Sequence, residues 1–376
     1  MKKIYLDYNA STPIAPKVSK AMKPFITDHY GNPSSHHWAG LPAKEAVEKS
    51  RSQIAGLLGC LPSEIVFTSG GTESNNHAIK GIFHALRERG NHIITSTIEH
   101  PAVIEPCHFL KRLGADITVV GVDGYGLIDP DAVRRAITKE TILISIMHAN
   151  NEVGTIQPIA DIAKIAHEHG ITVHTDAAQS IGKIPTKVSK LGVDLLTVAG
   201  HKVYAPKGVG ALYIKQGTKI EPMMHGAGHE SGRRAGTENV LLNVGLGMAC
   251  EIAESWTGMS QVKELRDRFW EMLHEEFGER VVLNGHPTER LSNTLNISFV
   301  NKVGSEILSK LDGVAASTGS ACHEGSVKLS PVLAAMGVSP QAGMGAIRFS
   351  LGRNTTMIEI DSVVNQLKEI WITRSK

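Results

Sequence analysis

The sequence predicts an α/β protein, with a large domain built on a mainly parallel seven-stranded sheet flanked by helices and a smaller α+β domain. Two features of the pattern carry this prediction. Short apolar strand patterns alternate with longer amphipathic helix patterns over the first two-thirds of the chain, and the alternation ends near residue 240. Such alternation is typical of α/β layers. The length of 376 residues also fits two or three domains, at roughly 100–200 residues each.

Seven short runs rich in Ile, Val and Leu are the expected strands of the large sheet. Several of these runs are almost continuously apolar, which is typical of strands buried on both faces of a parallel sheet. They span residues 64–68, 92–96, 116–120, 141–147, 172–176, 194–198 and 210–214.

Amphipathic patterns between the strands predict the helices that cover the sheet. The clearest span residues 43–58 and 158–169, and a further helix is expected after Pro101. Pro158 suits the first turn of its helix, because proline lacks the backbone N–H that would be unsatisfied there.

The chain beyond residue 240 predicts the smaller domain. A long helical stretch, two strands and a final helix are expected at residues 240–277, 293–299, 346–350 and 357–371. We expect the large domain to comprise residues 16–256, and the small domain to comprise residues 1–15 and 257–376.

Composition excludes several classes of protein. The chain has 39 basic and 37 acidic side chains, a formal net charge of +2, so direct binding of nucleic acid is not expected. No apolar run approaches the roughly 20 residues that span a bilayer, and the N-terminus does not resemble a signal peptide. We therefore expect a cytoplasmic protein that does not associate with membranes.

The four cysteines are not spaced as a disulfide framework or a zinc site. Cys60, Cys107 and Cys250 lie in apolar or helical patterns and are interpreted as packing residues. Cys322 lies in the small and polar run STGSACHEGS, which is typical of an exposed loop. A thiol in such a loop is a candidate for a functional role.

Polar side chains follow one strand after another in the expected sheet. They are a Gly-rich turn with Thr72 (residues 69–74), His100, Asn150, Asn151, Asp176, Gln179 and Lys202. Because ligands of parallel α/β sheets bind at the carboxyl ends of the strands, these side chains are expected to share one site.

The combination of a lysine, a carboxylate, a flat imidazole and a phosphate-type turn fits pyridoxal phosphate. A lysine amine can bind this cofactor covalently, and a carboxylate can keep its pyridine nitrogen protonated. Backbone N–H groups at a helix N-terminus can hold the phosphate. An aldolase that uses only a lysine would need neither the carboxylate nor the turn.

The order of the motifs and their residues resemble one family over the whole chain. The lysine signature VDLLTVAGHKVYAPKGVGAL (193–212) is similar to that of class V aminotransferase-type enzymes. The other matching motifs are LDYNASTP (6–13), GGTESNN (70–76), EHPAV (99–103), HANNEVG (148–154), HTDAAQ (174–179), GRRAGTENV (232–240), STGSACHEGS (317–326) and IRFSLGR (347–353). Together they resemble the cysteine desulfurases. The resemblance implies a homodimer with the aspartate aminotransferase-like fold type I and pyridoxal 5'-phosphate as cofactor.

The resemblance implies roles for the cofactor-binding residues. Lys202 would hold the cofactor covalently, Asp176 would pair with its pyridine nitrogen, and Gln179 would bind its ring hydroxyl oxygen. His100 would stack on the ring. The residues that match phosphate-binding positions are Gly71, Thr72, His201 and, toward the partner subunit's cofactor, Thr237.

The resemblance also assigns the substrate and sulfur positions. Asn151 and Arg348 match residues that hold the substrate, with Arg348 as the clamp on its carboxylate. Cys322 matches the nucleophile that receives sulfur as a persulfide. Lys202 would move the Cα proton, and His100 is a candidate to shuttle protons at the substrate thiol.

One position departs from the family pattern. Ala199 stands where the commoner desulfurases carry a phosphate-binding serine. We expect cofactor affinity to be lower by about one net hydrogen bond, on the order of 0.5–1.5 kcal/mol.

The implied reaction converts L-cysteine to L-alanine and loads sulfur on Cys322. Cys322 lies 26 residues before Arg348, which resembles the long-loop subgroup that delivers sulfur to separate acceptor or scaffold proteins. The sequence is compatible with each of these pathways: iron–sulfur cluster assembly, tRNA or DNA thiolation, and selenium supply.

Other functions remain open from the sequence. Selenocysteine lyase is the nearest, since ACH followed by LSPVL (329–333) resembles that relative, and L-selenocysteine would then be the substrate. A true aminotransferase and an inactive scaffold for sulfur carriers are more distant alternatives.

The remaining histidines and arginines give weaker signals. His225 and His229 and the HEH run at 167–169 lack a second pair of ligands, so no metal is expected. Arg233 and Arg234 fit either an anion site or a salt bridge in a loop.

Overall fold

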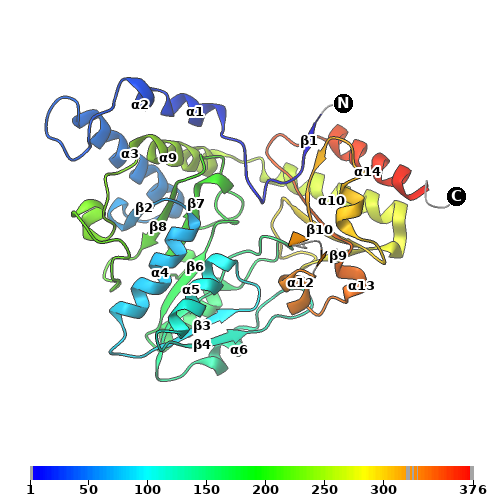
Figure 1. Cartoon of the computed structure of the whole chain (residues 1–376), viewed down its shortest axis with the longest axis horizontal. Helices are drawn as coiled ribbons and strands as arrows, with labels where there is room; N and C mark the ends of the chain where they lie inside the picture. The colour runs from blue at the N-terminus through cyan, green and yellow to red at the C-terminus, as the bar shows by residue number, and fades with distance from the viewer. Residues whose placement is uncertain (1–2, 319–321, 324–325, 328, 373–376) are drawn as a thin grey trace.

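The computed structural model describes residues 3–318, 322–323, 326–327 and 329–372, and only the backbone at 322–323, 326–327 and 372. Two sheets organise these residues. A seven-stranded sheet lies on one side of the molecule and a four-stranded sheet on the other, with the C-terminal helix beyond the smaller one (Figure 1).

The large sheet confirms the seven predicted strands. Its order is β2-β8-β7-β6-β5-β3-β4, and all neighbours are parallel except β8, which is antiparallel to β2 and β7. The strands are β2 (Ile65–Thr68), β3 (His92–Ser96), β4 (Asp116–Val120), β5 (Thr141–Ser145), β6 (Thr172–Asp176), β7 (Leu195–Ala199) and β8 (Gly210–Ile214). Every residue of β3, β5 and β7 is buried, which explains their continuous apolar runs.

Helices cover both faces of this sheet. The first group of helices is α1 (Pro16–Met22), α2 (Pro24–Thr27), α3 (Leu41–Leu58), α7 (Ile159–Glu168), α8 (Val188–Leu191) and α9 (Val240–Ser255). The second is α4 (Gly71–Ala85) and α5 (Pro101–Lys111). Helix α6 (Pro130–Ala136) lies with the first group, because it contacts α7 and its Val133 belongs to the same buried cluster. Ile54 of α3 and Leu246 of α9 belong to one buried apolar cluster, whereas Ile79 of α4 and Val103 of α5 belong to another. The predicted helices at 43–58 and 158–169 are confirmed.

The smaller sheet has the order β12-β15-β10-β9. Its strands are β9 (Val281–Asn284), β10 (Thr294–Phe299), β12 (Ser317–Thr318) and β15 (Ala346–Ser350), all antiparallel to their neighbours. Helices α10 (Met259–Phe277) and α14 (Met357–Ile372) pack on it around Phe269, Phe299 and Phe349. The short elements α11 (Gly304–Leu308), α12 (Pro331–Ala335) and α13 (Pro340–Gly343) complete this part, with β13 (Cys322–His323) paired to β14 (Ser326–Val327).

The prediction of one helical stretch over 240–277 is wrong in one respect. The stretch is two helices, because α9 ends at Ser255 and α10 begins at Met259. The backbone of Trp256 is extended rather than helical. Gly258 lies so close to the Trp256 ring that a Cβ there would be 2.8 Å from it, which suits a glycine in this connection. Strand β9 was not predicted, although its run VVLN carries a short strand pattern.

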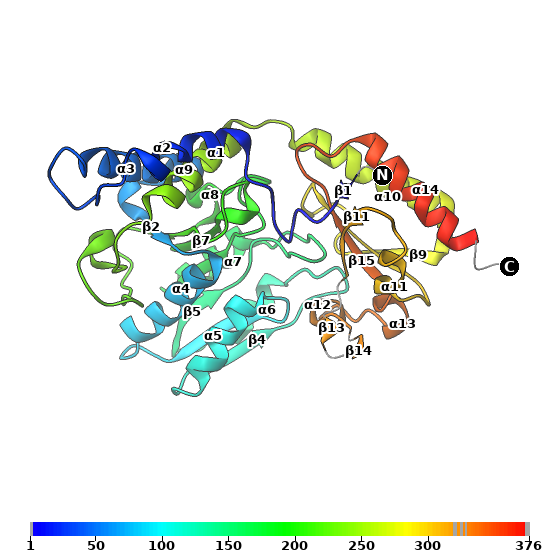
Figure 2. The same ribbon diagram turned by 45° about the horizontal axis from the view of Figure 1, so that its top comes forward.

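The N-terminal segment connects the two parts. Strand β1 (Ile4–Tyr5) pairs in parallel with β11 (Val314–Ala315), and the chain then crosses to α1 over the large sheet (Figure 2). The predicted division at residues 256 and 257 falls between α9 and α10 and stays a prediction. Among the described residues, the helices include none with the length and apolarity to cross a membrane.

Candidate functional site

A cavity of about 420 Å³ lies at the carboxyl ends of the large sheet's parallel strands. Its volume is in the range of small-molecule sites. The lining residues are Asn9, Ala10, Gly71, Thr72, Asn75, His100, Ala102, Met147, Ala149, Asn151, Asp176, Ala178, Gln179, Ala199, His201, Lys202 and Arg348. The structure therefore brings together nine of the predicted site residues: Gly71, Thr72, His100, Asn151, Asp176, Gln179, His201, Lys202 and Arg348.

Lys202 ends the short turn Gly200–Lys202 that directly follows β7. Its Nζ donates hydrogen bonds to the carbonyl oxygens of Asn9 at 2.7 Å and Ala10 at 2.8 Å. Burial, followed by the nearby Arg348 cation, lowers the pKa of Lys202 to about 8. A larger fraction of this amine is neutral near pH 8 than in an ordinary lysine, and a neutral amine is nucleophilic.

Asp176 is the last residue of β6 and is buried. Its Oδ2 accepts a hydrogen bond from Nδ2 of Asn75 at 2.7 Å, and its Oδ1 accepts one from the Ala178 N–H at 2.9 Å. These contacts orient the carboxylate at the cavity. We did not single out Asn75 from the sequence; its position four residues after Gly71, on the same face of α4, is the signal that could have found it.

The Gly-rich turn forms the first turn of α4. Gly70 has φ of 149°, which suits glycine, and Gly71 begins the helix. A Cβ on Gly71 would lie 3.2 Å from Cβ of Ala199, so the end of β7 lies against this turn. Free backbone N–H groups at a helix N-terminus attract an anion such as phosphate.

Two histidines border the cavity. Nδ1 of His100 accepts a hydrogen bond from the Ala102 N–H at 3.0 Å, which makes His100 the N-cap of α5. Burial lowers the pKa of His100, and burial followed by the Lys202 cation lowers that of His201 to about 4. Both rings are therefore biased toward the neutral form.

Arg348 reaches the cavity from β15 of the smaller sheet. One guanidinium nitrogen donates to the Asn151 carbonyl oxygen at 3.0 Å, and another donates to Oδ1 of Asp7 at 2.8 Å. Ser317 is the cross-strand partner of Arg348, and its hydroxyl also donates to Asp7 Oδ1, at 2.9 Å. Asp7 was not predicted, and a lone acidic residue in an N-terminal segment carries no local signal for this contact.

Asn150 and Thr237 were expected at the site but do not line the cavity. Asn150 is buried, and its Nδ2 donates to the Ile98 carbonyl oxygen at 3.1 Å. Thr237 is exposed in the segment before α9. Cys322 has a described backbone in β13, but its side chain lies outside the described residues. Strand β12, which precedes Cys322, pairs with β15 beside Arg348.

The predictions for Arg234 and for the three packing cysteines have outcomes in the structure. Arg234 forms a salt bridge with Glu73 at 2.9 Å, which supports the salt-bridge interpretation of that residue. Cys107 and Cys250 are buried and Cys60 is half-buried, as expected of packing residues, and burial raises the pKa of all three thiols to about 12. Within the described ranges, no cluster of three potential metal ligands occurs.

The cavity fits an anionic, planar cofactor such as pyridoxal phosphate. It combines a helix N-terminus for a phosphate, the carboxylate of Asp176 for a ring nitrogen and the amine of Lys202. Three buried polar atoms of lining residues have no partner among the described residues: Nδ1 of His201, Nε of Arg348 and Oδ1 of Asn75. Buried polar groups without partners are uncommon, and a ligand with donors and acceptors can satisfy them.

Comparisons with known proteins agree with this geometry. Residues 4–363 match the family model described as aminotransferase class-V. The chain is 50% identical to "Cysteine desulfurase IscS" of Dictyoglomus turgidum over 98% of this chain and 94% of that protein. It is 48% identical to "Cysteine desulfurase IscS" of Methanosarcina thermophila over 98% and 92%, respectively.

Solved structures are similar as well. A NifS-like protein superposes with a TM-score of 0.92 at 38% identity, covering 99% of this chain and all of that one (100%). A structure of SspA in complex with cysteine gives a TM-score of 0.83 at 41% identity, covering 93% of this chain and 99% of that one. The sequence, the fold and the cavity thus lead to one conclusion: the chain belongs to the cysteine desulfurases of the aminotransferase class-V family.

Proposed function

We propose that the cavity binds pyridoxal 5'-phosphate through Lys202 and that the enzyme uses it to transfer sulfur from L-cysteine to Cys322. The observation that carries this proposal is the convergence of Lys202, Asp176 and the N-terminus of α4 on one cavity. Bound there, the cofactor would withdraw electrons from the Cα of the substrate. Gly71, Thr72 and His201 would hold its phosphate, Gln179 its ring hydroxyl oxygen, and His100 would cover its ring.

Two residues would bind the substrate. The guanidinium of Arg348 would receive the carboxylate of L-cysteine, because a planar guanidinium binds a carboxylate through two parallel hydrogen bonds. Its buried Nε has no hydrogen-bond partner within the described part of the chain and would donate to such a ligand. Asn151, whose carbonyl already holds Arg348, would complete this end of the site.

Lys202 and His100 would move protons. The neutral Lys202 amine would take the Cα proton of L-cysteine held in the cavity. His100, whose pKa is lowered by burial, would accept or return a proton at the substrate thiol.

Cys322 would take the sulfur. Its thiolate would attack the substrate sulfur, forming an S–S bond while the Cβ–S bond breaks. The electron pair of the broken bond stays on the carbon skeleton, which is protonated and leaves as L-alanine. The balance is L-cysteine plus the Cys322 thiol giving L-alanine plus a Cys322 persulfide.

The assembly and destination belong to the same proposal. Thr237 would contact the cofactor phosphate of a partner subunit in a homodimer, which its exposure permits. Residues 16–256 would form the cofactor domain, and residues 1–15 and 257–376 would form the domain that carries Cys322 and Arg348. The persulfide would pass to acceptor proteins in the cytoplasm, where thiols stay reduced.

Mass spectrometry of the protein after incubation with L-cysteine tests the proposal. We expect one added sulfur on the peptide that contains Cys322 and, after borohydride reduction, the cofactor mass on Lys202. Cys322→Ala is expected to lose persulfide and most alanine formation, whereas Cys60→Ala, at a half-buried thiol, should keep both. Undiminished alanine formation by Cys322→Ala would contradict the role of this thiol.

The same assay separates the alternatives. Faster alanine formation from L-selenocysteine that survives Cys322→Ala would favour a selenocysteine lyase, in which the already ionised selenol needs less help. Amine transfer that depends on an added keto acid would favour an aminotransferase.

A further inference from the structure

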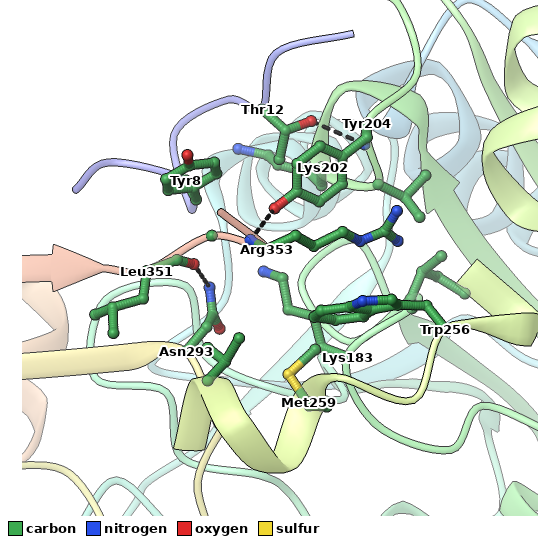
Figure 3. Close-up of a pocket in the computed structure, with 15 residues that line it drawn as sticks. Tyr8, Thr12, Lys183, Lys202, Tyr204, Trp256, Met259, Asn293, Leu351 and Arg353 are labelled. Carbon is green, nitrogen blue, oxygen red and sulfur yellow. Dashed lines mark hydrogen bonds between the residues drawn. The ribbon is translucent and has the colours of Figure 1, made fainter. Parts of the chain in front are cut away.

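A small pocket lies next to the cofactor cavity and shares Lys202 with it. Lys183, Tyr8, Tyr204 and Arg353 are among its lining residues (Figure 3). Lys183 follows β6 in the turn that also carries Gln179 and is half-buried. A lysine amine in such a place needs an explanation, because removing a cation from water is costly.

The Lys183 amine is bound by two neutral acceptors. Its Nζ donates to Oε1 of Gln179 at 2.9 Å and to Oδ1 of Asn9 at 3.2 Å. Oδ1 of Asn9 also accepts a hydrogen bond from Nδ2 of Asn293 at 3.0 Å. Both partners are amide oxygens rather than carboxylates, so these contacts do not neutralise the cation.

These contacts determine which end of the Gln179 amide faces which neighbour. Its Nε2 donates to the Asn9 carbonyl oxygen at 2.9 Å, the same oxygen that accepts from Lys202. A lysine ammonium only donates and a carbonyl oxygen only accepts. Rotating the amide by 180° would therefore place two donors together at Lys183 and two acceptors together at Asn9.

Gln179 consequently offers a donor to the cavity that it lines. An amide nitrogen carries two N–H groups, and only one is used by Asn9. The oxygen is occupied by Lys183, which lines the neighbouring pocket and is not among the lining residues of the cavity. A ligand oxygen that carries negative charge is the acceptor that this arrangement suits.

We propose that Lys183 is a positioning residue that holds Gln179 as a hydrogen-bond donor to the ring oxygen of the cofactor bound at Lys202. This inference rests on the proposed function, because it assumes that pyridoxal phosphate occupies the cavity. By stabilising the deprotonated ring oxygen, the oriented amide lowers the proton affinity of the bound chromophore.

The electrostatics of the site are consistent with this role. Burial, followed by the Lys202 and Arg348 cations, lowers the pKa of Lys183 to about 7. The amine can donate both hydrogen bonds whether or not it is protonated. A neutral amine could also accept a hydrogen bond, but the Asn9 carbonyl oxygen only accepts, so it keeps Nε2 of Gln179 in place at either charge of Lys183.

The test is a pH titration of the visible absorption of the resting enzyme loaded with pyridoxal phosphate. Lys183→Met removes both hydrogen bonds and keeps most of the side-chain volume. We expect the chromophore pKa to rise by about half a unit to one unit, the equivalent of one net hydrogen bond. Lys190→Met, at an exposed lysine of α8, is the matched control and should leave the titration unchanged.

A double-mutant comparison separates positioning from a direct effect of charge. Gln179→Ala alone should raise the chromophore pKa by a similar amount, and adding Lys183→Met to it should change nothing further. If the two shifts add, Lys183 acts on the cofactor by its charge and the positioning role is wrong. If Lys183→Met does not yield folded protein, Lys183→Leu removes the same two hydrogen bonds with a shorter apolar side chain and is subject to the same criteria.

The outcomes also distinguish this inference from the proposed function. A wild-type protein that stays colourless with pyridoxal phosphate, with no cofactor mass on Lys202 after borohydride, would overturn the proposed function. A coloured Lys183→Met variant with an unshifted titration would overturn only the role of Lys183.

Discussion

The pKa and the position of the Lys202 amine are set by its surroundings. The amine lies at the end of β7, where burial and the Arg348 cation lower its pKa, while two backbone carbonyls of the N-terminal segment hold its position. An exposed lysine has a pKa near 10.4 and is almost fully protonated at neutral pH. The environment of Lys202 thus increases the fraction of the neutral amine, the form that can attack an aldehyde.

Capture of pyridoxal phosphate by the cofactor-free protein should report this pKa. Only the neutral amine attacks, so the rate of chromophore formation should rise about tenfold per pH unit well below the pKa and level off above the value of about 8. Stopped-flow absorbance between pH 6 and pH 10, about two units on either side of the expected pKa, measures the pH dependence of this rate.

Arg348→Gln provides the comparison for that experiment. Removing this cation should move the midpoint to higher pH, because Arg348 is the second cause of the lowered pKa. A wild-type rate that keeps rising steeply up to pH 10 would show an ordinary lysine and contradict the interpretation.

At the scale of elements, the end of β7 and the first turn of α4 form the anion cradle together. The side chain of Ala199 lies against Gly71, and both residues line the cavity. The helix supplies backbone N–H groups to an anion. The strand supplies only the methyl group of Ala199, where a hydroxyl could donate a further hydrogen bond.

Ala199→Ser should therefore strengthen cofactor binding. One added hydrogen bond is worth about 0.5–1.5 kcal/mol, so we expect a dissociation constant lower by about twofold to tenfold. Equilibrium titration of the cofactor-free protein with pyridoxal phosphate measures this change.

Ala199→Val is the matched control, because it adds volume against Gly71 without adding a hydroxyl. We expect it to weaken binding, since a Cβ on Gly71 would already lie 3.2 Å from Cβ of Ala199. Binding by Ala199→Ser that is no tighter than in the wild type would mean that this position does not face the phosphate.

At the scale of the whole molecule, contacts between distant segments hold the site together. Asn9 is an example. Its N–H donates to the Ser350 hydroxyl of β15, and its carbonyl oxygen accepts hydrogen bonds from Gln179 and Lys202, which follow β6 and β7 of the large sheet. The N-terminal segment thus links the two sheets at the cavity.

A buried ion pair links other distant segments. Arg51 of α3 donates to Glu230 at 2.7 and 3.0 Å, and Glu230 also accepts a hydrogen bond from the Phe67 N–H of β2 at 2.9 Å. Arg51→Met would leave the Glu230 carboxylate buried without its cation. We expect the free energy of unfolding to fall by about 3–5 kcal/mol, measured by urea denaturation followed by circular dichroism.

Exposed and doubly substituted variants complete that experiment. Arg268→Met on α10 removes an exposed pair with Glu271 and should leave the denaturation midpoint unchanged. Combining Arg51→Met with Glu230→Leu should recover part of the loss, because no unpaired charge remains. A midpoint for Arg51→Met equal to that of the wild type would contradict a stabilising role for the pair.

Local patterns in the sequence were sufficient for much of the fold. The seven strands of the large sheet, the helices at 43–58 and 158–169 and the final helix were predictable, because burial imposes a period of apolar residues on each element by itself. The positions of His100, Asp176 and Lys202 were predictable in the same way, since each directly follows or ends a strand. The break between α9 and α10 was missed because the apolar pattern continues on both sides of it.

The partners of those residues depend on the folded chain. Asp7 meets Arg348 across 341 residues, Asn75 meets Asp176 across 101 residues, and Lys183 meets Asn9 across 174 residues. No local periodicity encodes such pairs, because they follow from the order of strands in each sheet and from how the two sheets pack. Residue identity therefore specified which chemical groups are available, whereas long-range packing specified which of them touch and how each is oriented.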